Sequence, residues 1–353
     1  MSSVVNSRQS LPLMPDAPQD VSAVRSRARS LAGGDTRVDP APSEARTRVG
    51  ILLCTYQGSE HLASQLDSFA RQTHTDWQVW ASDDGSVDGT LAILENYGRQ
   101  WRPGQLTILA GPRAGATKNF LQLTCLDALD ARVDYLAYSD QDDVWESHKL
   151  ERALAALREV PAGVPALYCS RTRLVDEHDT DLGLSPLFRK GPSFANALVQ
   201  SIGGGNTMVL NAAALALIRS AGPCVSAAYH DWWAYLVVTG CGGRVIYDTE
   251  PSLRYRQHSA NLLGTNVTWR SKWTRIRGLW EGRFRRWNDD NIAALRTMSD
   301  RLTPENRALV EQFASAREKP LVPRVAALYR CGIHRQTLLG NLGLLAAAVL
   351  KKI

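Results

Sequence analysis

Three carboxylates stand together where an apolar run of the chain ends, and side chains of this type at this spacing could hold a divalent cation. Asp140, Asp142 and Asp143 follow the run Tyr135-Leu-Ala-Tyr-Ser139. Carboxylates this close repel one another unless a cation lies between them. Asp also caps helices, and a helix is predicted to begin near Trp145. The cluster therefore predicts either a metal site or a helix start, and both interpretations stay open.

A second acidic cluster repeats this design. Asp83 and Asp84 follow the short apolar run Gln78-Val-Trp-Ala-Ser82, and Asp88 comes after a glycine turn and ahead of a helical stretch. A carboxylate at such a turn could accept charge-assisted hydrogen bonds from ribose hydroxyls or from a ring N–H. A plain turn residue is the alternative for Asp84, and a helix cap is the favoured interpretation of Asp88.

Asp231 is a candidate general base. It follows a loop of small residues and directly precedes the apolar helical run Trp233-Ala-Tyr-Leu-Val-Val238. The free N–H groups of a helix N-terminus stabilise a carboxylate, which can then accept a proton from a hydroxyl. An ordinary helix cap is the alternative, and the two interpretations are compatible. Three glycines, Gly203, Gly204 and Gly205, precede another extended run and either let the backbone approach a ligand closely or form a simple turn.

Strands must position these side chains. Short apolar runs over 48–54, 78–82 and 133–138 each end in a polar turn followed by a helical stretch. Repeated strand-to-helix units predict an α/β fold with a parallel sheet. Ligands of such sheets bind beyond the carboxyl ends of the strands, where all three acidic or polar turns fall.

Four motifs taken together resemble family 2 glycosyltransferases with the GT-A fold. They are Cys54-Thr-Tyr-Gln-Gly58, Asp83-Asp-Gly-Ser-Val-Asp-Gly-Thr90, Ser139-Asp-Gln-Asp-Asp143 and His230-Asp-Trp-Trp233. Within that family the chain is most similar to rhamnosyltransferase-like enzymes of bacterial surface polysaccharide synthesis. The resemblance covers roughly Arg48 to Gly264 and implies a Rossmann-like mixed sheet flanked by helices, with a helical C-terminal extension.

The resemblance also implies roles for individual residues. Thr55, Tyr56 and Asp84 would contact the nucleotide, Lys118 beside Arg113 the diphosphate, and Gly204 the donor sugar. Four further residues would lie at a divalent metal, Mg²⁺ or Mn²⁺, or at the sugar and phosphate groups beside it. In that set Asp140, Asp142 and His258 are the predicted metal ligands, Asp140 and His258 also lie close to the nucleotide sugar, and Asp143 orients the sugar or completes the metal shell. Arg254 and Arg256 could neutralise phosphate oxygens.

The implied reaction is an inverting transfer with Asp231 as the base. The donor would be a dTDP- or UDP-sugar, with rhamnose as the first candidate, and the acceptor a glycan or a polyprenyl-linked glycan. Two other function classes fit parts of the pattern. A metal-dependent nucleotidyl- or phosphotransferase would use the acidic clusters but leaves Asp231 unexplained, and a non-catalytic membrane-bound scaffold would tolerate the loss of the carboxylates.

Composition divides the chain into three parts. Residues 1–46 lack aromatic side chains and periodicity, which predicts a disordered tail; 47–265 form the predicted catalytic domain and 266–353 a helical region. No signal peptide is recognised, so residence in the cytoplasm, either free or peripheral on the inner face of the plasma membrane, is expected. The six cysteines are scattered without paired spacing, and disulfides are not expected.

The net charge of +6 is concentrated in one segment. Between Arg270 and Trp287 there are seven basic residues and one acidic residue, so nucleic acid is not expected as a partner. Aromatic residues over 269–287 recur at helical spacing, and 337–353 is a short apolar run. The first segment predicts either peripheral membrane contact or packing on the catalytic domain, and the second predicts docking on the membrane plane or on another subunit.

Overall fold

The computed structural model describes residues 47–129, 133–257 and 282–353, all of which belong to one compact unit, Arg46–Ile353. The predicted tail over 1–46, His258 and most of the basic aromatic segment lie outside the described residues. Among the described residues, nine strands form one sheet: β1 (Val49–Thr55), β2 (Trp77–Asp83), β3 (Leu106–Ala110), β4 (Tyr135–Ser139), β5 (Val144–Trp145), β6 (Ala166–Val175), β7 (Asp181–Leu184), β8 (Val209–Asn211) and β9 (Arg244–Arg256).

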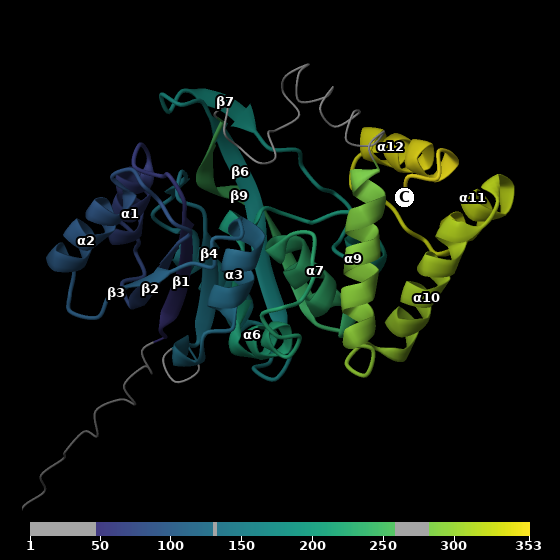
Figure 1. Cartoon of the computed structure of the whole chain (residues 1–353), viewed down its shortest axis with the longest axis horizontal. Helices are drawn as coiled ribbons and strands as arrows, with labels where there is room; N and C mark the ends of the chain where they lie inside the picture. The colour runs from purple at the N-terminus through teal and green to yellow at the C-terminus, as the bar shows by residue number, and fades with distance from the viewer. Residues whose placement is uncertain (1–46, 130–132, 258–281) are drawn as a thin grey trace, which may run out of the picture. The chain divides into compact units, whose positions relative to one another are not determined.

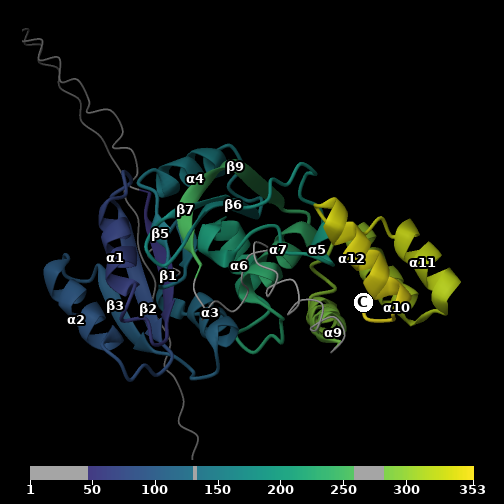
Figure 2. The same cartoon turned by 90° about the horizontal axis from the view of Figure 1, so that it is seen from above.

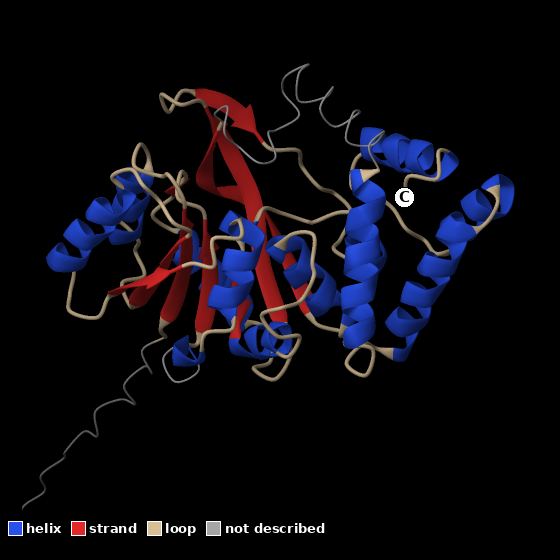
Figure 3. Cartoon of the chain, viewed as in Figure 1, coloured by secondary structure: helices blue, strands red, loops and turns tan. Residues whose placement is uncertain are grey.

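The sheet is mixed, as expected. Its order is β3-β2-β1-β4-β8-β6-β9-β5, with β7 paired to β6. The first four strands in this order run parallel, β8 is antiparallel to both of its neighbours, and β6 pairs with β9 in parallel. Figure 3 shows the sheet between helices on both of its sides. The parallel half brings the carboxyl ends of β1, β2 and β4 to one edge.

Alternating side chains of β1 explain why both faces of the sheet are covered. Leu52 and Cys54 belong to one apolar core, and Ile51 and Leu53 to a second core on the opposite face. The first core is filled largely from α3 (Ala116–Thr124), α5 (Phe194–Ala197), α6 (Ala212–Arg219) and α7 (His230–Gly240), and the second from α1 (Leu62–Ala70), α2 (Thr90–Gln100) and α4 (Lys149–Arg158). Figures 1 and 2 show these helices around the sheet. A strand buried on both faces reads as a continuous apolar run.

The predicted helix start near Trp145 is wrong. Val144 and Trp145 form the short strand β5 instead, and α4 begins at Lys149 with His148 at its N-cap. Asp140 and Asp142 therefore do not cap this helix. Asp88 does act at a helix start, because it accepts a hydrogen bond from the backbone N–H of Thr90 at 3.0 Å, although Gly89 occupies the N-cap position of α2.

The described C-terminal part is helical and packs on the first core. It comprises α9 (Arg283–Thr297), α10 (Pro304–Glu318), α11 (Leu321–Arg330) and α12 (Leu338–Val349). The ring of Trp287 lies 5.3 Å from that of Tyr229 and 6.5 Å from that of Trp232. The described end of the aromatic segment thus packs against the protein. No helix among the described residues is long and apolar enough to cross a bilayer.

Candidate active site

The parallel strands bring the two acidic clusters and the first polar turn to one edge of the sheet. Thr55 is aligned with Asp83 across β1 and β2, and Leu53 with Ser139 across β1 and β4. The hydroxyl of Thr55 is buried and donates to Asp83 at 2.9 Å. Tyr56, the next residue, is 58% exposed. Of the two residues predicted to contact the nucleotide from this turn, Thr55 is held within the protein and Tyr56 faces solvent.

Gln141 ties two of the predicted motifs together, a role that the sequence did not reveal. Its side-chain Oε1 accepts from the backbone N–H of Tyr56 at 2.8 Å, and its Nε2 donates to the carbonyl of Tyr56 at 2.9 Å. This pair of hydrogen bonds fixes the turn after β1 against the turn after β4. Gln141 lies between Asp140 and Asp142 in sequence, and a neutral amide in an acidic cluster does not by itself predict a contact with a distant turn.

Asp84 organises the loop that leads into α3. Its two carboxylate oxygens accept from the backbone N–H groups of Arg113 and Gly115, at 2.6 and 2.8 Å. The backbone of both loop residues lies in the left-handed region, with φ of 55° and 87°, a conformation that favours glycine. Lys118 is exposed in the first turn of α3, just beyond this loop. Asp84 and Lys118 therefore share one corner of the site.

The cluster after β4 concentrates negative charge in a buried setting. Asp140 is partly buried, and burial, followed by the charges of Asp142 and Asp231, raises its pKa to about 7. Asp143 is fully buried and accepts from Nδ2 of Asn206 at 2.5 Å. Burial and the neighbouring aspartates also raise its pKa. The charge of Asp231, the candidate base, is among the causes of the raised pKa of Asp140.

Lys149 supplies a buried positive charge next to this cluster, and the sequence analysis missed it. Its ammonium group donates to the carbonyl of Asn206 and lies 4.1 Å from the ring centre of Trp145. Burial lowers its pKa to about 7, while the charges of Asp143 and Asp140 oppose that shift. A lysine at the start of a helix normally reads as a surface residue, so only its burial reveals the role.

Arg256, predicted to neutralise phosphate oxygens, is engaged with groups of the chain itself. It is 5% exposed, and its guanidinium donates to the carbonyls of Asp142, Asp176 and Glu177 and pairs with Asp179. Arg254 pairs with Glu146 at 3.1 Å and with Asp179 at 3.6 Å. Strand β9 runs antiparallel to β5, which turns both arginines toward carboxylates of the chain itself. Arg256 thus supports the acidic cluster through the carbonyl of Asp142.

The glycine loop packs against the first turn of α7. Gly205 begins the short 3₁₀ turn η2 (Gly205–Thr207), and a Cβ on it would overlap Nε2 of His230 and lie 3.3 Å from Cβ of Asp231. The ring of His230 stacks on Phe120 with centroids 3.9 Å apart, and burial lowers its pKa to about 3. His230 is thus neutral at physiological pH. Gly204, the predicted sugar contact, is exposed at the same loop.

Asp231 lies in the first turn of α7, as predicted. Its Oδ1 accepts from the backbone N–H of Trp232 at 2.6 Å. Burial raises its pKa to about 6, against the lowering effect of hydrogen bonds from the backbone of Trp232 and Gly205. A carboxylate with this pKa is ionised near neutral pH and still basic enough to take a proton, which suits a general base.

Gly205→Ala is expected to lower kcat on the order of tenfold, because the added methyl group displaces His230 and Asp231 by a few tenths of an ångström or more. Steady-state kinetics on purified protein, with a thermal melt, test this. Gly191→Ala is the matched control, since nothing lies within 4 Å of a Cβ at that position. Equal kcat for both variants and the unaltered chain would show that the close approach has no catalytic consequence.

The family model described as Glycosyl transferase family 2 matches residues 50–209. Among curated proteins, the dTDP-rhamnosyl transferase RfbG of Shigella flexneri is 29% identical over 237 residues, which span 64% of this chain and 78% of that protein. The glucosyltransferase WfgD of Escherichia coli, described as UDP-Glc:alpha-D-GlcNAc-diphosphoundecaprenol beta-1,3-glucosyltransferase, is 26% identical over 109 residues, 31% of this chain and 40% of that protein.

One solved structure shows the shared architecture. Residues 1–349 of TarS from S. aureus, crystallised with UDP-GlcNAc, superpose with a TM-score of 0.50 at 15% identity. The match covers 82% of this chain and 93% of that one. At this level of identity the likeness shows the fold alone, and it confirms the predicted fold class.

Proposed function

The chain contains a glycosyl transferase family 2 domain on a GT-A fold, and from this premise we propose that it moves a sugar from a nucleoside diphosphate to a hydroxyl group of a glycan or lipid-linked glycan during cell-surface polysaccharide synthesis. One observation carries the proposal: the partly buried Asp231 packs against Gly205, and the next residue of that loop, Asn206, donates to Asp143 of the acidic cluster at 2.5 Å. A base next to a candidate diphosphate site is what a transfer to a hydroxyl requires.

The residues divide into a nucleotide side and an acceptor side. Tyr56 and Asp84, supported by Thr55 beneath the turn, would hold the nucleoside, while Lys118 would lie toward the diphosphate. Strands β2 and β4 pair with β1 on its two sides, so Asp84 and Asp140, which follow them, flank the end of β1. A nucleotide bound at Asp84 would thus extend its diphosphate toward Asp140, with the sugar near Gly204 and Asp231.

The carboxylates fit a divalent cation, Mg²⁺ or Mn²⁺. Asp140 and Asp142 are separated by one residue, and burial, followed by the charges of Asp142 and Asp231, raises the pKa of Asp140 to about 7. Within the described residues no three His, Cys, Asp or Glu side chains form a complete metal site, but Mg²⁺ needs only one or two carboxylates beside substrate oxygens and water. Such an ion would stabilise the charge that grows on the departing diphosphate. His258, the third predicted ligand, lies outside the described residues.

The proposed reaction is a single displacement. Asp231 takes the proton of the acceptor hydroxyl as the hydroxyl oxygen bonds to the anomeric carbon. The bond between that carbon and the diphosphate oxygen breaks with its electron pair, so the configuration inverts. Neutral His230, stacked on Phe120, packs beside Asp231 without competing for the proton. The backbone N–H of Trp232 keeps the Asp231 carboxylate oriented.

Rhamnose from dTDP-rhamnose is the first donor to test, because the relative RfbG is named a dTDP-rhamnosyl transferase and spans most of the matched domain. UDP-glucose is the second, after WfgD. A screen of nucleotide sugars, with and without Mn²⁺ or Mg²⁺, should give sugar transfer or slow donor hydrolysis for one of them. Turnover of nucleoside triphosphates without any sugar donor would instead support a nucleotidyltransferase, and no turnover of any kind would support a scaffold.

The pH dependence of kcat should report the base. The folded-state pKa of Asp231 is raised to about 6, and only the ionised form accepts a proton. Log kcat should therefore rise with a slope of about one as pH approaches 6 from below, and then level. Measurements at two saturating Mn²⁺ concentrations separate this group from Asp140, whose protonation competes with the metal. The assignment of Asp231 as the base would be contradicted if the pH at which log kcat levels changed with Mn²⁺ concentration. It would also be contradicted if kcat fell as pH rose toward 6.

A further inference from the structure

Helices α11 and α12 carry most of the large apolar side chains that the described residues expose. Val322 and Tyr329 of α11 are 76% and 86% exposed, and Leu338 and Leu339 at the start of α12 are 78% and 80% exposed. These helices and the residue after α12 also expose Leu321, Leu342, Leu345, Val349 and Leu350. Exposed apolar side chains concentrated in this way mark an interaction surface.

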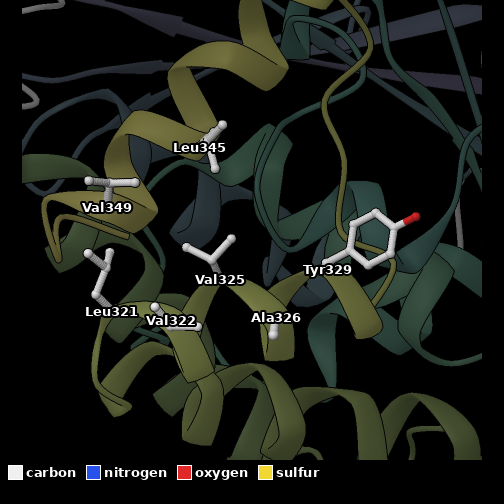
Figure 4. A pocket seen from close by; sticks show the side chains of 7 residues that line it. All are labelled: Leu321, Val322, Val325, Ala326, Tyr329, Leu345 and Val349. Atoms are coloured by element: carbon white, nitrogen blue, oxygen red, sulfur yellow. The ribbon is translucent and has the colours of Figure 1, made fainter.

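A groove of about 510 Å³ runs between the two helices. Figure 4 shows Leu345 and Val349 on the α12 side and Leu321, Val322 and Val325 on the α11 side. The opposite faces of the helices are already used, since Leu328 of α11 and Leu344 of α12 are buried in the first core. Each helix thus packs on the protein through one set of apolar side chains and exposes a second set that does not contribute to the core.

Basic residues outnumber acidic ones around this surface. From Lys319 to Ile353 the chain contains six basic residues and no Asp or Glu. Lys319 and Arg330 are exposed at the two ends of α11, and Lys351 is exposed just after α12. Lys351 lies 3.5 Å from Glu318 of α10, whereas no ion pair within the described part of the chain engages Lys319 or Arg330. Apolar side chains flanked mainly by basic ones, with Glu318 as the one acidic neighbour named here, complement a surface of anionic headgroups.

We propose that the α11–α12 face docks on an anionic lipid surface. The exposed leucines, Val322 and Tyr329 would enter the boundary between headgroups and acyl chains, and Lys319 and Arg330 would lie among the headgroups. A second copy of the chain fits this face less well. In a twofold contact the same basic residues would meet one another, and this stretch has no carboxylate to neutralise them.

This inference deepens the proposed function and rests on it in one respect: a transferase with a lipid-linked acceptor would meet that acceptor at such a surface. The binding itself does not depend on catalysis. Vesicle binding and sugar transfer to a water-soluble acceptor are separate measurements, so either proposal can fail while the other stands.

Co-sedimentation of the full chain with vesicles tests the docking surface. We expect binding to vesicles of equal parts phosphatidylcholine and phosphatidylglycerol, little binding to phosphatidylcholine alone, and weaker binding at high salt. Val322→Gln/Leu339→Gln should reduce the apparent affinity on the order of tenfold or more, through loss of buried apolar area. Lys319→Gln/Arg330→Gln should reduce it on the order of tenfold at low salt.

Leu182→Gln/Leu184→Gln on β7 is the matched control, because these leucines are also exposed, at 46% and 42%, but lie on a strand of the sheet and not on α11 or α12. It should bind vesicles like the unaltered chain, and circular dichroism melts should show that all variants fold. Binding that survives Val322→Gln/Leu339→Gln, or no binding to either vesicle, would overturn the proposal. A dimer in light scattering that this same variant disperses, without vesicle binding, would assign the face to a second copy.

Discussion

Asp231→Asn is expected to lower kcat by a factor on the order of 10²–10⁴, the usual contribution of a general base. Asparagine keeps the size and the hydrogen bond from the backbone of Trp232 but accepts no proton from the acceptor. The Kd for the nucleoside diphosphate should change little, because the nucleotide side of the site is formed by other residues. Single-turnover transfer assays and calorimetric titration with the nucleotide measure the two effects separately. Transfer at an unaltered rate would remove Asp231 from the mechanism.

The same substitution should stabilise the fold. Burial raises the pKa of Asp231 from 3.8 to about 6, so the ionised form costs free energy in the folded state at pH 7. Asparagine removes this cost, and the free energy of unfolding should increase by about 1–3 kcal/mol. The gain should shrink as pH falls from 6 toward 3.8 and vanish below that, where both states are protonated. Urea titrations at several pH values measure it.

Asp88→Asn is the control for this stabilisation. Asp88 accepts hydrogen bonds from the backbone of Ser59 and Thr90, both at 3.0 Å, and should lose stability on the same substitution. If the free energy of unfolding increases for Asp231→Asn and decreases for Asp88→Asn, the first carboxylate serves catalysis and the second serves the fold. A loss for both would show that the Asp231 carboxylate also serves the fold.

Lys149→Met should destabilise the fold by about 3 kcal/mol, because it leaves the buried carboxylates without their internal counter-charge. Methionine is one atom shorter than lysine and keeps most of its volume without the ammonium group that lies over the ring of Trp145. Because the pKa of Lys149 is about 7, the loss should be larger at pH 6, where the ammonium is charged, than at pH 8. Mn²⁺ should raise the melting temperature of the variant more than that of the unaltered chain. Thermal melts across pH and metal concentration provide the measurement.

Lys118→Met is the matched control for Lys149→Met. Lys118 is exposed on α3, so its substitution should change stability by less than about 0.5 kcal/mol at either pH. If Lys149→Met were equally harmless, the ammonium group would not be the charge that holds the acidic cluster, and Asp143 would have to be protonated in the unaltered protein.

The parallel half of the fold could be predicted from local patterns. The runs at 49–55 and 77–83 are short, apolar and followed by polar turns, because strands that are buried on both faces must exclude charge until they end. The helix at Asp231 could be predicted for a similar reason, since its first turn carries an acid and the rest is apolar. The start of α4 was predicted four residues too early because Val144 and Trp145 pair with β9, a partner far along the chain.

The sequence by itself determined which carboxylates are available for chemistry and that Asp83, Asp84 and the Asp140 cluster follow strands of one sheet, because strand burial and turn chemistry are local properties. Only the tertiary structure decided which side chains surround them. Gln141 locks the turn at Tyr56, Arg256 braces the cluster from behind, and Lys149 lies buried beside Asp143. These contacts join segments that are 85 and more than 100 residues apart, or depend on a burial that no local pattern encodes. The sequence gives the type of each charged side chain. Its interaction partners and the polarity of its surroundings are set only when the sheet and helices pack.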